Sequence, residues 1–233
     1  KSSAASDVYK RQADTRVFCE VTQLGKELEK IGSRVMGSEN HAKVGIIFDW
    51  ENYWALEYTS GPNRDLRYVD QIEQMYNYFY NKNIAVDMIP IDADFSKYDL
   101  VAAPVLYMVK DGVAESLEAY VQAGGTLITT YMSGIVGQSD NVHLGGYPGP
   151  LRKMAGVWVE EIDALAPEQR NKIRFADGTE EECRLVCDLM HLEGAEEIAQ
   201  YESDFYAGMT AVAKNQFGKG TVYSVSYTHL RAH

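Results

Sequence analysis

Residues 44–54 read Val-Gly-Ile-Ile-Phe-Asp-Trp-Glu-Asn-Tyr-Trp. The apolar run at 44–48 is typical of a strand buried on both faces, as the strands of parallel sheets are. It changes abruptly into an acidic and aromatic cluster. In open α/β sheets, ligands and partners bind at the carboxyl ends of the strands. The cluster is therefore the first candidate for a functional surface. Its members are Asp49, Trp50, Glu51, Asn52, Tyr53 and Trp54.

Strand and helix patterns alternate after this first strand. Further strands are predicted at 85–90, 100–104 and 126–130, with helices at 67–82 and from a capping Asp111 to Gly124. A loop is expected at 57–66. Strands separated by helices of this length indicate right-handed crossovers on a parallel sheet. The layout is similar to the class I glutamine-amidotransferase-like (flavodoxin-like) α/β fold.

The pattern changes after Gly156, where short strands replace the alternation. They are predicted at 158–160, 172–175, 185–190, 198–201, 211–214 and 221–224. We therefore expect a parallel sheet flanked by helices, with an added β-rich portion. Between the two parts lies a long Gly- and Pro-rich loop at 133–150, which contains Tyr147. A loop of this length inside a compact domain is usually functional.

The two ends of the chain look different from the rest. Residues 1–12 and 225–233 have no hydrophobic period and resemble translated sequencing-adapter ends, so we leave them out of the predicted fold. The expectation is that the natural protein extends in both directions. Residues 13–32 predict an amphipathic helix that ends at Gly32, and 33–43 form a polar linker. The apolar face of this helix carries Val17, Val21, Leu24, Leu28 and Ile31.

Composition excludes several classes of function. The net charge of −12 and the pI of about 4.9 argue against nucleic acid and anionic membranes as partners. No apolar run reaches the roughly 18 residues of a membrane helix, and no signal peptide is visible. Three cysteines do not suggest a disulfide framework, so we expect a reducing cytoplasm. No cofactor is predicted.

Cys183, Cys187 and His191 recur every four residues. On a helix this spacing would place three metal ligands on one face. Residues 184–190 read equally well as a strand, which would leave the two thiols buried and idle. We assign no metal to them.

Two catalytic arrangements compete with a non-catalytic interpretation. Asp49 and Glu51 could act as the paired carboxylates of a glycosidase, but the aromatic residues around them also suit an interface anchor or a wall of a substrate site. Ser133, with His143, could form a nucleophile pair. No Gly-x-Ser-x-Gly surrounds Ser133, and no phosphate-binding glycine motif follows a strand. We therefore predict no catalytic residue in this chain.

Several stretches together resemble one known family. They are 44–57, 65–68, 100–107, 124–127 and 144–151. The chain resembles the middle, or trimerisation, domain of the family 42 glycoside hydrolases, which are bacterial β-galactosidases. The resemblance covers about residues 14–224 and implies an amidotransferase-like fold without amidotransferase chemistry, which agrees with the absence of a cysteine after the strand at 126–130.

The resemblance also implies that catalysis and subunit assembly belong to different domains of the parent enzyme. Residues 13–32 would be the last helix of a catalytic (β/α)8 barrel, and that barrel would carry both glutamates of a retaining mechanism. The whole enzyme would hydrolyse terminal β-D-galactosides. This piece would be inactive alone, would assemble a homotrimer and would help to wall the neighbouring active site. The alternative is a stand-alone, non-catalytic module of amidotransferase-like fold that binds a sugar or a partner.

Overall fold

The computed structural model describes residues 13–59 and 61–229. The chain divides into two units, Lys1–His41 and Ala42–His233, which are described separately. The first unit contains the helix α2 (Arg16–Val35), which begins after Thr15, whose hydroxyl accepts the N–H of Phe18 at 3.3 Å. No residue of α2 is buried. The apolar row predicted from the sequence is therefore exposed in this structure.

The predicted end of this helix at Gly32 is wrong. The helix continues to Val35, with Met36 as its C-cap. A glycine ends a helix when it adopts a left-handed conformation. That conformation occurs at Gly37 (φ 79°) and not at Gly32.

The second unit is built on one sheet of 11 strands. Its order is β11-β7-β6-β8-β9-β10-β4-β3-β1-β2, with β5 paired to β7 outside this path. The first strands are β1 (Val44–Ile47), β2 (Val86–Ile89), β3 (Leu100–Ala103) and β4 (Thr126–Thr130). The later strands are β5 (Val157–Ala164), β6 (Asn171–Phe175), β7 (Glu180–Leu192), β8 (Glu196–Tyr201), β9 (Thr210–Phe217), β10 (Gly220–Val225) and β11 (Tyr227–His229).

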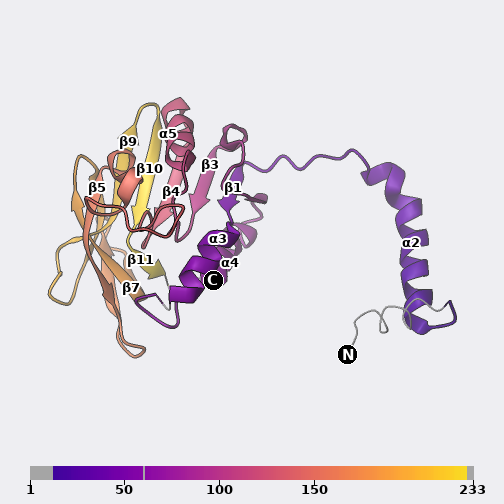
Figure 1. Cartoon of the computed structure of the whole chain (residues 1–233), viewed down its shortest axis with the longest axis horizontal. Coiled ribbons are helices and arrows are strands. Elements are labelled where there is room, and N and C mark those ends of the chain that lie inside the picture. Colours follow the sequence, from indigo (N-terminus) through magenta and orange to yellow (C-terminus); the bar gives the residue numbers. More distant parts are fainter. Residues whose placement is uncertain (1–12, 60, 230–233) are drawn as a thin grey trace. The chain divides into compact units, whose positions relative to one another are not determined.

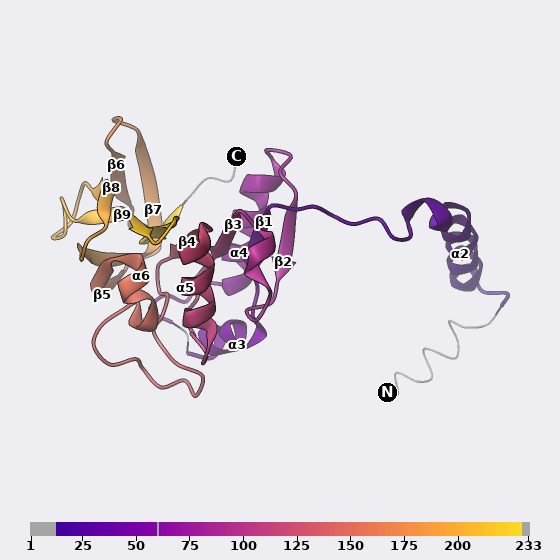
Figure 2. The same ribbon diagram turned by 90° about the horizontal axis from the view of Figure 1, so that it is seen from above.

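Helices connect the early strands. They are α3 (Trp50–Thr59), α4 (Tyr68–Tyr80), the 3-10 helix η1 (Phe95–Lys97) and α5 (Val113–Ala123), followed later by η2 (Gly149–Leu151) and α6 (Arg152–Ala155). The parallel strands with α3, α4 and α5 gather on one side of this unit, and β5 to β9 on the other (Figures 1 and 2).

β1 is buried on both faces, as predicted, and β3 is almost completely buried. Successive residues of β1 and β3 alternate between two hydrophobic clusters. One cluster includes Leu117 and Val121 of α5, and the other includes Leu56 of α3 and Ile72 of α4. Burial on both faces explains why these strands read as apolar runs without alternation.

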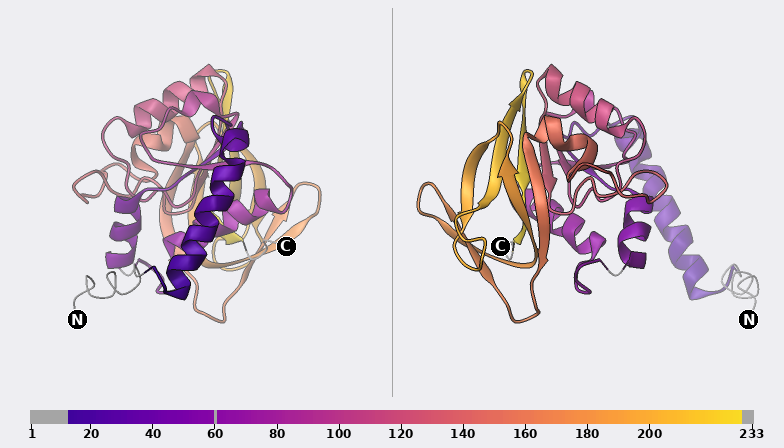
Figure 3. Two further views of the ribbon diagram at one scale, coloured as in Figure 1. Left: turned by 90° about the vertical axis from the view of Figure 1, so that its right-hand side faces the viewer. Right: turned by 60° about the vertical axis from the view of Figure 1, so that its left-hand side comes forward.

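The late strands are not an added portion, which corrects the predicted fold. β10 pairs in parallel with β4 on one side and antiparallel with β9 on the other. One mixed sheet, mostly antiparallel, therefore runs through the whole unit, and its orange and yellow strands lie together on one side (Figure 3). β7 also pairs with β9, so the late strands curl back on themselves. Pairing between segments so distant in the chain leaves no local pattern in the sequence.

Several predicted boundaries are also wrong. β7 is longer than the predicted strand at 185–190: it runs from Glu180 to Leu192 and continues through Leu185, whose φ is 68°. α5 starts after Gly112, and no side chain caps it, so Asp111 is not its cap. Residues 225–229 were left out of the predicted fold, yet Val225 ends β10 and β11 pairs with β7.

Within the described ranges 13–59 and 61–229, no helix is long and apolar enough to cross a membrane.

Candidate functional site

The acidic and aromatic cluster lies just after β1, as predicted, and forms the start of the helix α3. Asp49 directly precedes this helix, and its Oδ2 accepts the backbone N–H of Asn52 at 3.0 Å. A carboxylate in this place satisfies one of the free N–H groups of the first turn and interacts favourably with the helix dipole. This helix was not predicted from the sequence because large aromatic residues lie on its exposed face, so that the helix has no amphipathic pattern.

Asn52 ties the start of α3 to the segment that follows β3. It is fully buried. Its Nδ2 donates to Asp49 Oδ2 at 2.8 Å and to the carbonyl of Met108 at 3.1 Å, and its Oδ1 accepts the N–H of Met108 at 2.7 Å. Every polar atom of this amide side chain therefore has a partner. The arrangement holds the helix in one orientation.

Lys110 neutralises the two carboxylates of the cluster. Its Nζ lies 2.8 Å from Asp49 Oδ1 and also forms an ion pair with Glu51. Burial lowers the pKa of Lys110, but hydrogen bonds and attraction from both carboxylates outweigh this effect, so the pKa is raised overall. Both carboxylates thus pair with the ammonium group of Lys110, and Asp49 also caps the helix α3. A glycosidase acid needs surroundings that raise the pKa of its carboxyl group, and a paired cation does not provide them.

An aromatic row lies on the outer face of α3, and we define it as Trp50, Trp54 and Tyr58. These side chains are 60%, 53% and 88% exposed. The ring centroids of Trp50 and Trp54 are 6.2 Å apart. Because the three residues are spaced by four, they share one face of the helix. Neither indole fills the core of this unit.

An inner aromatic layer supports this row. The ring of Phe48 meets Trp50 edge to face at 5.0 Å, and the ring of Tyr53 lies 6.4 Å from Tyr68. The hydroxyl of Tyr68 accepts the N–H of Asp49 at 3.2 Å. Burial raises the pKa of Tyr68 to about 12, so the phenol stays neutral. The exposed row therefore rests on the buried Tyr68 and on the partly buried Phe48 and Tyr53.

Sequence reasoning missed two contributors to this site, Tyr58 and Lys110. The spacing of four from Trp50 to Tyr58 was visible, but it has meaning only on a helix, and 57–66 was predicted to be a loop. Lys110 is 61 residues from Asp49, and no local pattern links them. Only the fold brings them together.

Tyr147, the seventh candidate, lies on the long loop and not on α3. It is half-buried and packs against the hydrophobic core. The carbonyl of Tyr147 accepts the N–H of Val159 at 2.9 Å. Close by, a side chain on Gly146 would lie 2.2 Å from Trp158 Nε1, so only glycine fits there. The loop is thus fastened to β5 through Tyr147 and Gly146.

The alternative chemistries find no support among the residues that the structure describes. The Ser133 hydroxyl is buried and donates to the carbonyl of Thr130 at 2.6 Å, while His143 Nε2 has no hydrogen-bond partner in that part of the chain.

Cys183 and Cys187 are buried on β7 with their sulfurs 3.7 Å apart, which agrees with the strand interpretation. His191 pairs instead with Glu160 at 2.6 Å. No cluster of three His, Cys, Asp or Glu side chains occurs in the described ranges.

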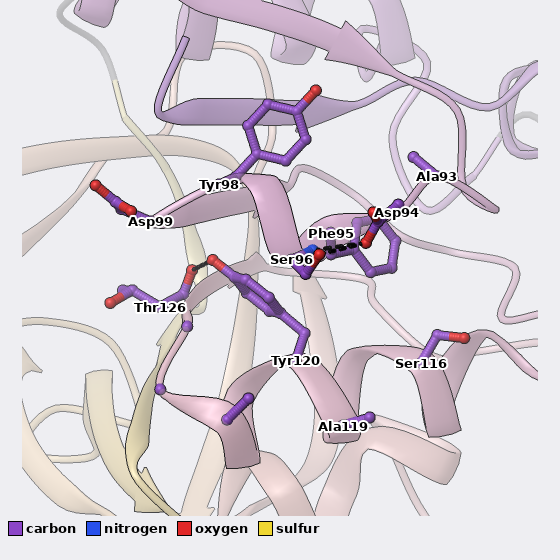
Figure 4. Close-up of a pocket in the computed structure, with 13 residues that line it drawn as sticks. Ala93, Asp94, Phe95, Ser96, Tyr98, Asp99, Ser116, Ala119, Tyr120 and Thr126 are labelled. Atoms are coloured by element: carbon purple, nitrogen blue, oxygen red, sulfur yellow. Dashed lines mark hydrogen bonds between the residues drawn. The ribbon is translucent and has the colours of Figure 1, made fainter. Parts of the chain in front are cut away.

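A separate groove of about 850 Å³ lies between η1 and α5 (Figure 4). Its polar groups are engaged: Tyr120 donates to the carbonyl of Thr126 at 3.2 Å, and Ser96 donates to Asp94 at 2.6 Å. Asp99 and Thr126 place it at the amino ends of β3 and β4. Ligands of open α/β sheets bind at the opposite ends, so we assign no function to this groove.

Comparison with known proteins identifies the family. The family model described as the β-galactosidase trimerisation domain matches residues 42–232. The chain belongs to this family. The resemblance found in the sequence is thereby confirmed, and the matched residues include the whole sheet of the trimerisation domain, from β1 to β11.

Relatives and solved structures agree with this assignment. The chain is 49% identical over 225 residues to β-galactosidase LacZ of Lactobacillus acidophilus, covering 97% of this chain and 34% of that protein. It is 46% identical over 221 residues to β-galactosidase Pbg of Clostridium perfringens, covering 92% and 32%. The crystal structure of β-galactosidase from Bacillus circulans sp. alkalophilus matches 94% of this chain and 33% of its own, with 45% identity and a TM-score of 0.86. The chain therefore spans about a third of the length of its relatives.

Proposed function

We propose that this chain is the subunit-assembly domain of a β-galactosidase that hydrolyses terminal β-D-galactosides with retention. The relatives are named β-galactosidases, and the family is described as a trimerisation domain. In this proposal three copies of the parent protein associate, and the domain also helps to wall the active site of a neighbour. Catalysis belongs to a barrel that precedes the domain in the parent.

One observation carries this proposal: the aromatic row is exposed and yet rigidly held. Trp50 and Trp54 present their indoles to solvent, while buried Asn52 fixes the helix beneath them. Large aromatic side chains on a fixed element are the usual hot spots of protein interfaces, where truncation costs about 2 kcal/mol or more. We infer that Trp54 and Tyr58 contact a neighbouring subunit and that Trp50 faces the substrate.

The domain arrangement is part of the same proposal. We assign α2 to the end of the preceding barrel, the residues that follow it up to 43 to a linker, and the sheet from β1 to β11 to the trimerisation domain. The exposed apolar row of α2 supports the first assignment. An amidotransferase-like (flavodoxin-like) core is supported by the order β2-β1-β3-β4-β10, which corresponds to the flavodoxin order 2-1-3-4-5. The three free cysteines favour a cytoplasmic protein.

The experiment compares single substitutions in the full-length parent enzyme. We expect Trp54→Ala to weaken the trimer by about tenfold or more in sedimentation velocity. Trp50→Ala should raise KM for a β-galactoside and leave the trimer intact. Phe205→Ala, an equally exposed aromatic residue outside α3, is the matched control and should change neither quantity.

Two results would contradict the proposal. One is an intact trimer with unchanged kinetics in both tryptophan variants. The other is a trimer that dissociates equally in the Phe205 control, which would place the interface elsewhere. The alternative of a stand-alone binding module is not favoured, because the similar proteins described above are β-galactosidases.

A further inference from the structure

A small polar cavity lies at the carboxyl ends of β4 and β10, where they meet β7. Its volume is about 20 Å³, enough for a single particle the size of a water molecule. Oxygen-bearing side chains from three strands and the following turns line it. They are Thr129, Thr130, Tyr131, Ser133, Asp188, Ser224 and Ser226. No lysine or arginine lines it.

Asp188 supplies the only carboxylate of this cavity. The residue is 5% exposed. Its Oδ2 accepts the N–H of Met132 at 2.9 Å, whereas its Oδ1 is buried without a hydrogen-bond partner among the described residues. A buried carboxylate oxygen with neither a donor nor a cation nearby is costly. When Asp188 is ionised, this free oxygen therefore favours an occupant of the cavity that can satisfy it.

Three of the hydroxyl groups in this lining direct their protons to backbone carbonyls. Ser133 donates its proton to the carbonyl of Thr130 at 2.6 Å, and Ser226 donates to that of Ala211 at 2.6 Å. Thr129 directs its proton to the carbonyl of Tyr223 at 3.4 Å. These hydroxyls have only oxygen lone pairs left to offer. The cavity thus combines one negative charge with several oxygen acceptors.

We propose that this cavity is a binding site for one monovalent alkali cation, with Asp188 as its counter-charge. Hard cations prefer carboxylate, hydroxyl and carbonyl oxygens as ligands. A single carboxylate balances one positive charge, whereas protein sites for divalent cations usually contain several. Such an ion joins β4 and β10 of the parallel part to β7 of the antiparallel part. The site is independent of the aromatic row and of subunit assembly.

The test is thermal unfolding of the whole chain at pH 8 in sodium, potassium or choline chloride at equal ionic strength. Choline is too large for the cavity. We expect the melting temperature to rise saturably with sodium or potassium, by about 3–6 °C when the cation is at ten times its dissociation constant. Choline should have no such effect. The response to the alkali cation should disappear in Asp188→Asn and persist in Asp177→Asn, whose carboxylate lies in an exposed turn.

A second measurement does not depend on the folding of a variant. Crystals of the wild-type chain soaked in thallium(I) or rubidium should give an anomalous peak beside Asp188 Oδ1. Identical melting temperatures in all three salts, with no such peak, would overturn the proposal and indicate a water molecule. A cation response of equal size in Asp188→Asn would place the ion elsewhere and would also overturn it.

Discussion

The ammonium nitrogen of Lys110 lies 2.8 Å from Oδ1 of Asp49, and so joins the residue before α3 to the segment after β3. Both side chains are mostly buried, at 18% and 10% exposure. Attraction between charges is stronger there than at an exposed surface, because water screens it less. This ion pair and the amide of Asn52 hold the helix that carries the aromatic row.

Removing the cation of this pair should destabilise the domain. We expect Lys110→Met to lower the free energy of unfolding by about 2–4 kcal/mol, because Asp49 would stay buried without its counter-charge. Urea denaturation measures the change. The control is Lys43→Met, since Lys43 forms an exposed ion pair with Asp99 and its loss should cost less than about 1 kcal/mol. Equal effects in the two variants would show that the buried pair adds no stability.

Asp188 should make stability depend on pH. Burial raises the pKa of its carboxyl to about 7, whereas an aspartate in the unfolded chain titrates near 3.9. Between about pH 4 and pH 7 the folded state keeps a proton that the unfolded state has lost. The contribution to stability is therefore complete below about pH 4 and decreases by up to about 1.4 kcal/mol per pH unit as pH rises to 7.

This pH dependence is best measured by denaturation in choline buffers, which contain no alkali cation. We expect the slope to be smaller in Asp188→Asn than in the wild type. If the two proteins show the same slope between pH 4 and pH 7, Asp188 is not the group responsible.

The exposed apolar face of α2 should drive self-association of the isolated chain. Each aliphatic side chain contributes about 1.5–3 kcal/mol when it is buried, and Val21 and Leu24 are 63% and 54% exposed. Replacing both with glutamate should reduce aggregation in light scattering without changing the melting of the second unit. A double replacement on the polar face, Gln23→Glu with Lys26→Gln, lowers the net charge by the same two units and is the control for added negative charge. Loss of folding in the Val21/Leu24 variant would show that α2 packs within this chain.

The isolated chain should have no β-galactosidase activity. Retaining hydrolysis needs two carboxyl groups about 5 Å apart, one of them with a raised pKa. Asp49 and Glu51 are instead neutralised by Lys110. Incubation with a chromogenic β-galactoside should give only background hydrolysis. Turnover that is lost in Asp49→Asn or Glu51→Gln would contradict this prediction and the proposal that catalysis belongs to a preceding barrel.

The sequence by itself determined the family and most of the strands and helices of the second unit. β1 and β3 were predicted because a strand buried on both faces is almost uniformly apolar, a property visible in a single short segment. α4 was predicted because its buried and exposed faces differ in polarity. The candidate residues at 49–54 were found because they follow β1 directly.

Only the tertiary structure decided how these pieces combine. α3 was missed because its exposed face is aromatic, so that no polar side marked it as a helix. The continuity of the sheet depends on β10 pairing with both β4 and β9. The pairing of Lys110 with Asp49 and the free oxygen of Asp188 likewise arise where distant segments meet. Local patterns record whether a segment is buried, but the identity of its neighbours is set by packing across the whole chain.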